Sequence, residues 1–185
     1  MVSGILHKAG PMVSFFCTFA PMNRAIYLSA ISLLPILLLS CRHHHPMTEA
    51  ESSLIKDSVR QLTASIAHDV STKGPAAWLD HFDNAPGFFM ASDGSLDFPD
   101  YAAAKRFILD TLVKNIPTIT LNWTAVRIYP LSRRLAAIGA DFHEVLTTAD
   151  GKDMPVEGYF SGTAAFTGQG WKLLNLHWST RAQAR

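Results

Sequence analysis

The hydrophobic periodicity of the chain changes at Pro117, and this change constrains the fold more than any other feature. Before Pro117, apolar residues recur every three or four positions, which is the period of an amphipathic helix. After it, apolar and polar residues alternate, which is the period of a half-buried strand. The pattern predicts long antiparallel strands that follow one another directly along the chain. The alternating runs cover residues 118–129, 134–147, 155–168 and 171–180.

Helices are predicted before this change. Thr48 and Glu51 have the spacing of a capping box, and the helix that they begin is expected to run to about Thr72. Helices first and a meander of strands after them is an α+β arrangement, with three helices packed on one face of a curved, mostly antiparallel sheet. The other predicted elements are a second helix over 76–82, a short strand over 88–91 and a third helix from about Pro99 to Pro117.

The segment that precedes this domain has the pattern of a bacterial lipoprotein leader. Arg24 is followed by a charge-free apolar run over 25–40, and Ser40 stands before Cys41. The run resembles leaders read by the lipoprotein signal peptidase, in which the Cys becomes the acylated first residue of the mature protein. A transmembrane anchor is the alternative, but the run is shorter than the roughly 20 residues that span a bilayer, and Pro35 interrupts it.

These observations predict the organisation and location of the chain. Residues 1–40 are expected to be the leader, with the signal peptide itself over 22–40, followed by the lipidated Cys41 and a tether over 41–47 and by one domain over 48–185. The expected location is the bacterial cell envelope, where the protein would be lipid-anchored at the periplasmic face or the outer membrane.

The composition of the chain gives no indication of nucleic-acid binding, of disulfides in the domain or of a metal site. From Arg42 onward the chain has 14 Lys and Arg against 15 Asp and Glu, with the signs interspersed, so no basic patch indicates nucleic acid. Cys17 and Cys41 both precede the domain, so the domain is expected to fold without disulfides. His43-His44-His45 is interpreted as part of a solvated tether, because neighbouring residues of an extended chain make poor co-ligands. We expect no metal and no cofactor.

The element order and the residues at 89–94, 135–138 and 170–179 carry a resemblance to a known family. Over about residues 49–180 the chain resembles the nuclear transport factor 2-like superfamily, in its polyketide-cyclase-like (SnoaL-like) branch. The closing strand is also similar in spacing to that of the association domain of calcium/calmodulin-dependent kinase, where a Trp precedes a His-x-Ser ending. The resemblance implies a cone-shaped fold with a pocket between the helices and the concave sheet face. It implies no single activity, because the superfamily includes isomerases, dehydratases, cyclases, ligand carriers and assembly domains.

Strand alternation divides the polar and aromatic residues between two faces of the sheet. The more apolar face is assigned to the helices, and the other is the convex face where, by the resemblance, two subunits often meet. A single bulge would exchange the two faces from that point along a strand. The predicted pocket residues are Trp78, Phe82, Tyr101, Asn122, Phe142, Glu144 and Trp178. The predicted dimer face contains Trp123, Asp141, His143, Tyr159 and His177.

The predicted function is the binding, without transformation, of a small hydrophobic or aromatic molecule by a lipid-anchored homodimer. One alternative is a cofactor-independent isomerase, dehydratase or cyclase that acts by proton transfer, and a second is a structural dimerisation module. The enzyme hypothesis finds limited support, because Glu144 is the only carboxylate expected at a buried position and no nucleophile elbow or phosphate loop is present. Asp141 and His143 could form a dyad, but alternation assigns both to the outward face.

Overall fold

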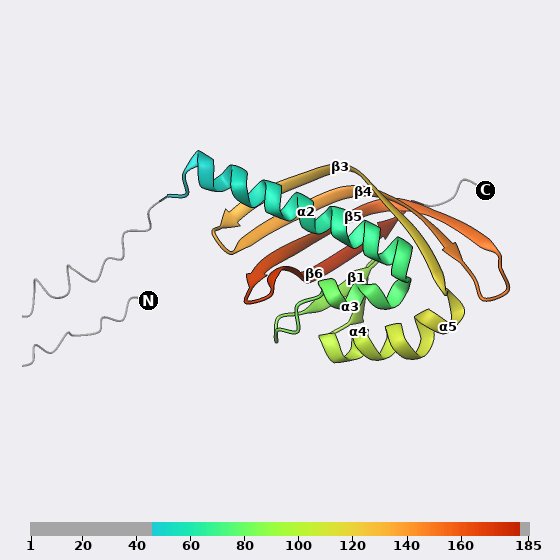
Figure 1. Ribbon diagram of the computed structural model, residues 1–185. Helices are drawn as coiled ribbons and strands as arrows, with labels where there is room; N and C mark the ends of the chain where they lie inside the picture. The colour runs from blue at the N-terminus through green and yellow to red at the C-terminus, as the bar shows by residue number, and fades with distance from the viewer. Residues whose placement is uncertain (1–45, 182–185) are drawn as a thin grey trace, which may run out of the picture. The chain divides into compact units, whose positions relative to one another are not determined.

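The computed structural model describes Pro46–Arg181, and the predicted leader with Cys41 lies outside this range. Within these residues the chain forms helices on one side of a curved sheet (Figure 1). The described part contains no helix that is both long enough and apolar enough to span a membrane.

Helix α2 (Glu49–Lys73) begins where the capping box predicted it. The Thr48 side chain accepts a hydrogen bond from the Glu51 amide at 3.2 Å, and the Glu51 carboxylate accepts one from the Thr48 amide at 2.8 Å. The helix ends at Gly74, whose φ of 84° favours glycine. Its buried residues recur at helical spacing on one face: Ile55, Val59, Leu62, Thr63, Ile66 and Val70.

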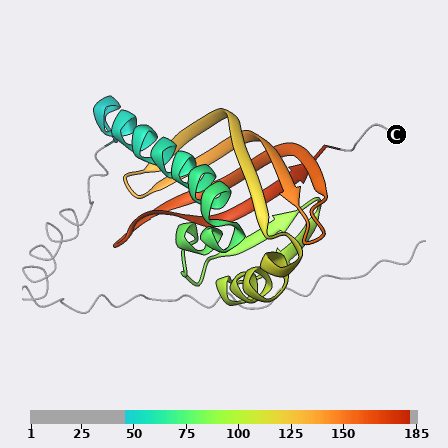
Figure 2. The same ribbon diagram turned by 45° about the vertical axis from the view of Figure 1, so that its right-hand side comes forward.

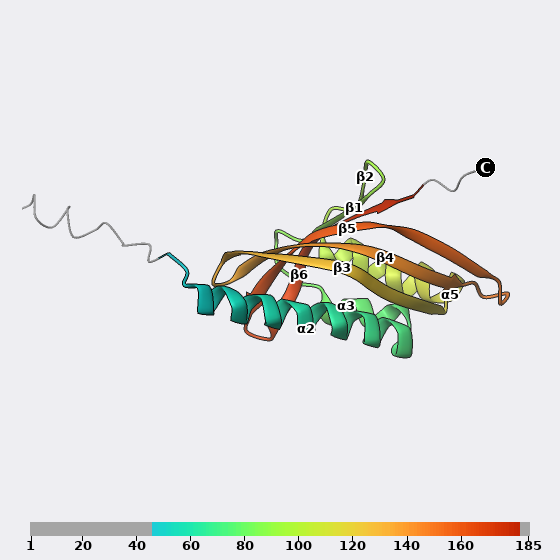
Figure 3. The ribbon, with the colours of Figure 1, turned by 90° about the horizontal axis from the view of Figure 1, so that it is seen from above.

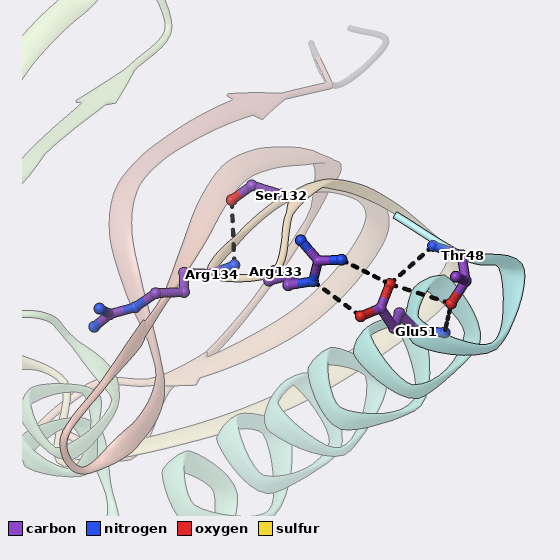
Figure 4. Close-up of polar contacts among 5 residues, drawn as sticks. All are labelled: Thr48, Glu51, Ser132, Arg133 and Arg134. Carbon is purple, nitrogen blue, oxygen red and sulfur yellow. Dashed lines mark hydrogen bonds and ion pairs between the residues drawn. The ribbon is translucent and has the colours of Figure 1, made fainter. Parts of the chain in front are cut away.

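Glu51 also connects the start of α2 to the sheet (Figure 4). Its carboxylate accepts hydrogen bonds from Arg133 Nε at 2.9 Å and from Arg133 Nη2 at 3.1 Å. These bonds, together with those from Thr48, lower the pKa of Glu51 to about 2. The charged pair therefore joins the first turn of the helix to a distant hairpin of the sheet.

Short elements connect α2 to the long strands. The third predicted helix is observed as a continuous run that begins after Asp100, whose side chain accepts a hydrogen bond from the Ala103 amide. Its middle is a turn of π-helix, a form that recurs at functional sites. Strand β2 (Ser95–Phe98) was not predicted. The elements are η1 (Pro75–Ala77), α3 (Trp78–His81), β1 (Phe89–Ser92), β2 (Ser95–Phe98), α4 (Tyr101–Phe107), η2 (Ile108–Leu112) and α5 (Val113–Asn115).

The predicted alternating runs form the long strands of one six-stranded sheet. The strand order is β2-β1-β6-β5-β4-β3, with β1 and β6 parallel and the other neighbours antiparallel. The predicted α+β arrangement is therefore confirmed. The long strands are β3 (Thr118–Ser132), β4 (Leu135–Thr147), β5 (Asp153–Thr167) and β6 (Gly170–Thr180).

Helix α2 covers the edge strand β3 (Figures 1 and 2). The Ser71 hydroxyl accepts a hydrogen bond from the Leu121 amide at 2.9 Å, so a side chain of the helix pairs with the free edge of the strand. The η1–α3 segment and the α4–η2–α5 run lie on the same side of the sheet as α2 (Figure 3). All helices of the described residues therefore pack on one face, and the core lies between them and the sheet.

A bulge in β3 changes which residues face the helices. The pairing with β4 shifts between Thr124 and Arg127, and Ala125 takes a φ of 48°, which is unusual for a residue with a side chain. Before the bulge the odd-numbered residues face the core, and after it the even-numbered residue Ile128 does so. The register also shifts between Pro130 and Ser132 of β3, and between β5 and β6, where Ala164 pairs with Leu173. Such bulges bend long strands and contribute to the curvature of the sheet.

Candidate ligand-binding pocket

A cavity of about 280 Å³ lies between the concave sheet face and the helices. Strands β3, β4, β5 and β6 form one wall, and α3, β1, β2 and the α4–η2 run contribute the others. Phe107 and Thr180 are the exposed members of the lining and therefore mark its opening. The lining residues are Trp78, Phe82, Met90, Phe98, Phe107, Ile108, Leu112, Ile119, Phe142, Glu144, Leu146, Val156, Leu176, Trp178 and Thr180.

Trp178 is at the centre of the aromatic wall. Its ring centroid lies 4.8 Å from that of Phe142 and 5.7 Å from that of Trp78, both in edge-to-face arrangements. Phe82 stacks on Trp78 at 5.8 Å and continues the wall. Edge-to-face and offset pairs of this kind are favourable beyond the area that they bury. The rings of the wall are therefore held in place by packing on one another.

Glu144 is the ionisable residue that faces the pocket. It lies on β4 two residues after Phe142, between Leu121 on β3 and Val156 on β5. Among the described residues its carboxylate has no hydrogen-bond or ion-pair partner. Burial in these apolar surroundings raises its pKa from 4.5 to about 7. The site therefore contains a carboxyl group that changes charge near neutral pH.

The other polar side chain of the lining, Thr180, is already bonded. Its hydroxyl donates to Asp93 Oδ2 at 2.7 Å, and its amide donates to Asp93 Oδ1 at 2.8 Å. These bonds lower the pKa of Asp93. The Asp93 carboxylate thus connects the β1–β2 turn to the end of β6, and Thr180 is engaged at the pocket opening.

The pocket contains five of the seven residues predicted for it: Trp78, Phe82, Phe142, Glu144 and Trp178. The prediction was wrong for Asn122, which is exposed on the other face of β3 because it precedes the bulge. It was also wrong for Tyr101, which packs edge-to-face on Phe88 beside the pocket at 6.0 Å. Phe98 and Phe107 also line the pocket and were not predicted, because they reach it through the unpredicted strand β2 and the helix after it.

Trp123 was assigned to the outer face, and this assignment was wrong for the same reason. It lies before the bulge, pairs with Phe142 and faces the helices. Its ring stacks on Trp178 at 5.6 Å and contacts Phe160 at 5.2 Å, behind the pocket wall. Its indole Nε1 is buried and has no hydrogen-bond partner within residues 46–181.

Asp141, His143, Tyr159 and His177 lie on the outer face, as alternation predicted. Asp141 and His143 do not form a dyad. Instead His143 lies 3.8 Å from Glu157, and Asp141 lies 3.4 Å from Arg181. These groups are partly exposed and are separated from the pocket by the sheet. Their arrangement gives no support to a catalytic role.

A different His–Asp pair joins α2 to α3. His81 Nε2 lies 3.0 Å from Asp69 Oδ2, and Lys73 contacts the other carboxylate oxygen at 2.9 Å. The hydrogen bond from Lys73 lowers the pKa of Asp69, and burial lowers that of His81. Neither Asp69 nor His81 lines the pocket. The residues described contain no cluster of His, Cys, Asp and Glu that could hold a metal ion.

The architecture matches solved structures of one fold. An NTF2-like superfamily protein from Salmonella enterica superposes with a TM-score of 0.61 at 18% identity, over 72% of this chain and 95% of that chain. A candidate scytalone dehydratase from Novosphingobium aromaticivorans gives a TM-score of 0.63 at 9% identity, over 73% and 89%. A hexachlorocyclohexane dehydrochlorinase of type 2 gives 0.56 at 9% identity, over 75% and 96%.

These likenesses show the nuclear transport factor 2-like fold, and the predicted fold class is confirmed. No protein-family model matches the chain, and no curated protein matches it. Proteins of this fold include enzymes, as the names of two of these structures indicate. Fold alone does not determine function, so the function has to be argued from the pocket.

Proposed function

We propose that this protein binds a small hydrophobic or aromatic molecule in the pocket and releases it unchanged. The observation that carries the proposal is the composition of the lining, which is aliphatic and aromatic except for Glu144 and Thr180. Apolar walls with very few polar groups are typical of small-molecule sites. The Thr180 hydroxyl already donates to Asp93, so it adds little chemistry of its own.

Proton-transfer catalysis is the second candidate. A general base is most effective when its pKa lies near the working pH, and the pKa of Glu144 is raised to about 7. The enzymes among the solved structures of this fold also support the hypothesis of proton-transfer catalysis. Such a reaction also needs a donor that stabilises the developing negative charge. Among the described lining residues the N–H donors that accompany Glu144 are the indoles of Trp78 and Trp178, and both rings are packed within the aromatic wall, so binding is the better-supported function.

Filling the pocket should abolish binding of an apolar fluorescent probe. We expect the purified protein to enhance the fluorescence of N-phenylnaphthylamine, and Leu146→Trp to weaken binding at least tenfold because Leu146 lines the cavity. Leu131→Trp is the matched control, because Leu131 is exposed and outside the lining. Equal probe affinity in both variants and the unmutated protein would contradict a binding role for this cavity.

We further propose that the protein is anchored to the bacterial envelope through Cys41. Two or three acyl chains give firm attachment, because each buried methylene adds about 0.8 kcal/mol. In a bacterial host, Cys41→Ser is expected to move the protein out of the detergent-extracted membrane fraction or to block leader cleavage. Cys17→Ser, which changes the other cysteine, is expected to behave as the wild type. A Cys41→Ser protein that is processed and anchored normally would refute the proposal.

A homodimer through the outer sheet face also belongs to the proposal. Ala137, Gly139 and Thr163 place only small side chains on part of this face, and the neighbouring Tyr159 is 40% exposed. We expect dimers at tens of micromolar in sedimentation velocity. Thr163→Arg should shift the protein towards monomer, whereas Gln169→Arg, in an exposed turn, should not. A monomeric unmutated protein at that concentration would contradict this prediction.

A further inference from the structure

The pocket surrounds an acidic group without a partner. Glu144 projects among Leu121, Val156 and the aromatic wall, and no other titratable or charged side chain of the described lining faces it. On the neighbouring strand, Glu157 lies on the opposite face beside His143. An ionised carboxylate in apolar surroundings is costly unless an opposite charge accompanies it. The protein itself supplies no such charge within residues 46–181.

Aromatic rings stand on the same wall as this carboxylate. Phe142 lies two residues before Glu144 on the same face of β4, and the Trp178 ring lies 4.8 Å from the Phe142 ring. Trp78 and Phe82 extend the group along α3 and beyond. The faces of such rings attract cations, and Trp does so most strongly. A carboxylate beside several rings is therefore complementary to an organic ammonium group.

On the basis of the proposed binding function, we propose that the pocket selects apolar molecules that carry one protonated amino group. The ammonium would pair with the Glu144 carboxylate, and the apolar part would pack against the rings around Trp178. A volume of about 280 Å³ suits a molecule with one or two fused rings and a short amine side chain. The pair would form inside a cavity that excludes much of the water, where a charge-assisted hydrogen bond is strong.

The affinity for such a ligand depends on pH through Glu144. The ammonium requires the ionised carboxylate, and burial raises the pKa of Glu144 to about 7. An aliphatic amine stays protonated well above this value, so only the carboxyl group titrates in this range. The affinity should therefore fall roughly tenfold from pH 8 to pH 6, since the ionised fraction falls by that factor.

Three probes of nearly equal shape test the inference: naphthylethylamine as the cation, naphthylethanol as the uncharged hydrogen-bond donor and naphthylacetate as the anion. By calorimetry at pH 8, we expect the amine to bind at least tenfold more tightly than the alcohol, and the acetate to bind most weakly. In Glu144→Gln the preference for the amine should disappear while alcohol binding is retained. Glu157→Gln, the matched change on the outer face, should leave the preference intact.

The outcomes separate this inference from the function on which it rests. If the amine and the alcohol bind equally well, the proposed preference for cations is wrong, but the proposed binding of hydrophobic molecules still stands. Tighter binding of the acetate than of the amine would have the same two consequences. Failure of all three probes to bind would overturn both proposals. If Glu144→Gln does not fold, the pH profile of the unmutated protein decides: an amine affinity that is constant between pH 6 and pH 8 refutes a role for Glu144.

Discussion

Trp178→Ala is expected to lower the free energy of unfolding by about 3–5 kcal/mol, the usual range for a large aromatic residue removed from a core. Trp178 is 9% exposed and contacts four aromatic rings, so the surrounding structure cannot collapse into the space that it leaves. The same truncation should widen the pocket, because Trp178 is also part of its lining. The four contacting rings belong to Trp78, Trp123, Phe142 and Phe160.

Denaturant unfolding and probe affinity, measured on the same samples, test both parts of this prediction. Trp171→Ala is the control, because Trp171 is only half-buried, packs on the exposed Phe166 and lies outside the pocket. Trp171→Ala should lower the free energy of unfolding by less than Trp178→Ala does, and it should leave probe binding unchanged. A large stability loss with unchanged binding of small and large probes would show that Trp178 acts in the core alone and would remove the main support for the site.

Glu144→Gln should change how stability depends on pH. The carboxyl group has a pKa of about 7 in the folded protein and about 4.5 in the unfolded chain, so the folded state holds its proton more tightly. Its contribution is therefore fully present below about pH 4.5 and is lost as the pH rises through about 7. The loss is about 3 kcal/mol at most, because one pKa unit corresponds to about 1.4 kcal/mol and water at the pocket opening reduces the effect.

The variant should consequently be more stable than the unmutated protein at pH 8 and about equal to it at pH 4.5. The difference between the two proteins is the quantity to measure, because other groups titrate as well. Burial lowers the pKa of His81, so its contribution is lost as the pH falls below about 6.5. The pKa of Glu51 is lowered to about 2, so its contribution is lost in more acidic solution still. A constant difference across pH 4.5 to 8 would contradict a raised pKa of Glu144 in the folded protein.

Local sequence determined the helices and most of the strands. Helix α2 begins at the capping box of Thr48 and Glu51 and ends at Gly74. Both signals act through hydrogen bonds and dihedral angles within one or two turns, so they could be predicted directly from the sequence. Strand alternation in β4 has no interruption, and Phe142 and Glu144 could therefore be assigned to one face. Strand alternation therefore placed Phe142 and Glu144 correctly in the predicted site.

Contacts between distant elements decided the rest. The bulge at Ala125 exchanges the faces of β3, and nothing in the local pattern of that strand marks it, so Asn122 and Trp123 were assigned to the wrong sides. Strand β2 forms only by pairing with β1, which is why Phe98 was missed as a wall of the pocket. Asp69 and His81 meet only because η1 and α3 fold back on α2.

The sequence by itself therefore determined the element order, the α+β class and the apolar character of one sheet face, since each depends on residues close together in the chain. The tertiary structure alone decided where the pocket opens and that Glu144 has no partner among the residues described. The desolvation that raises the pKa of this carboxyl group arises from side chains on separate strands and helices. A charge in the sequence becomes a binding determinant only once those elements exclude water around it.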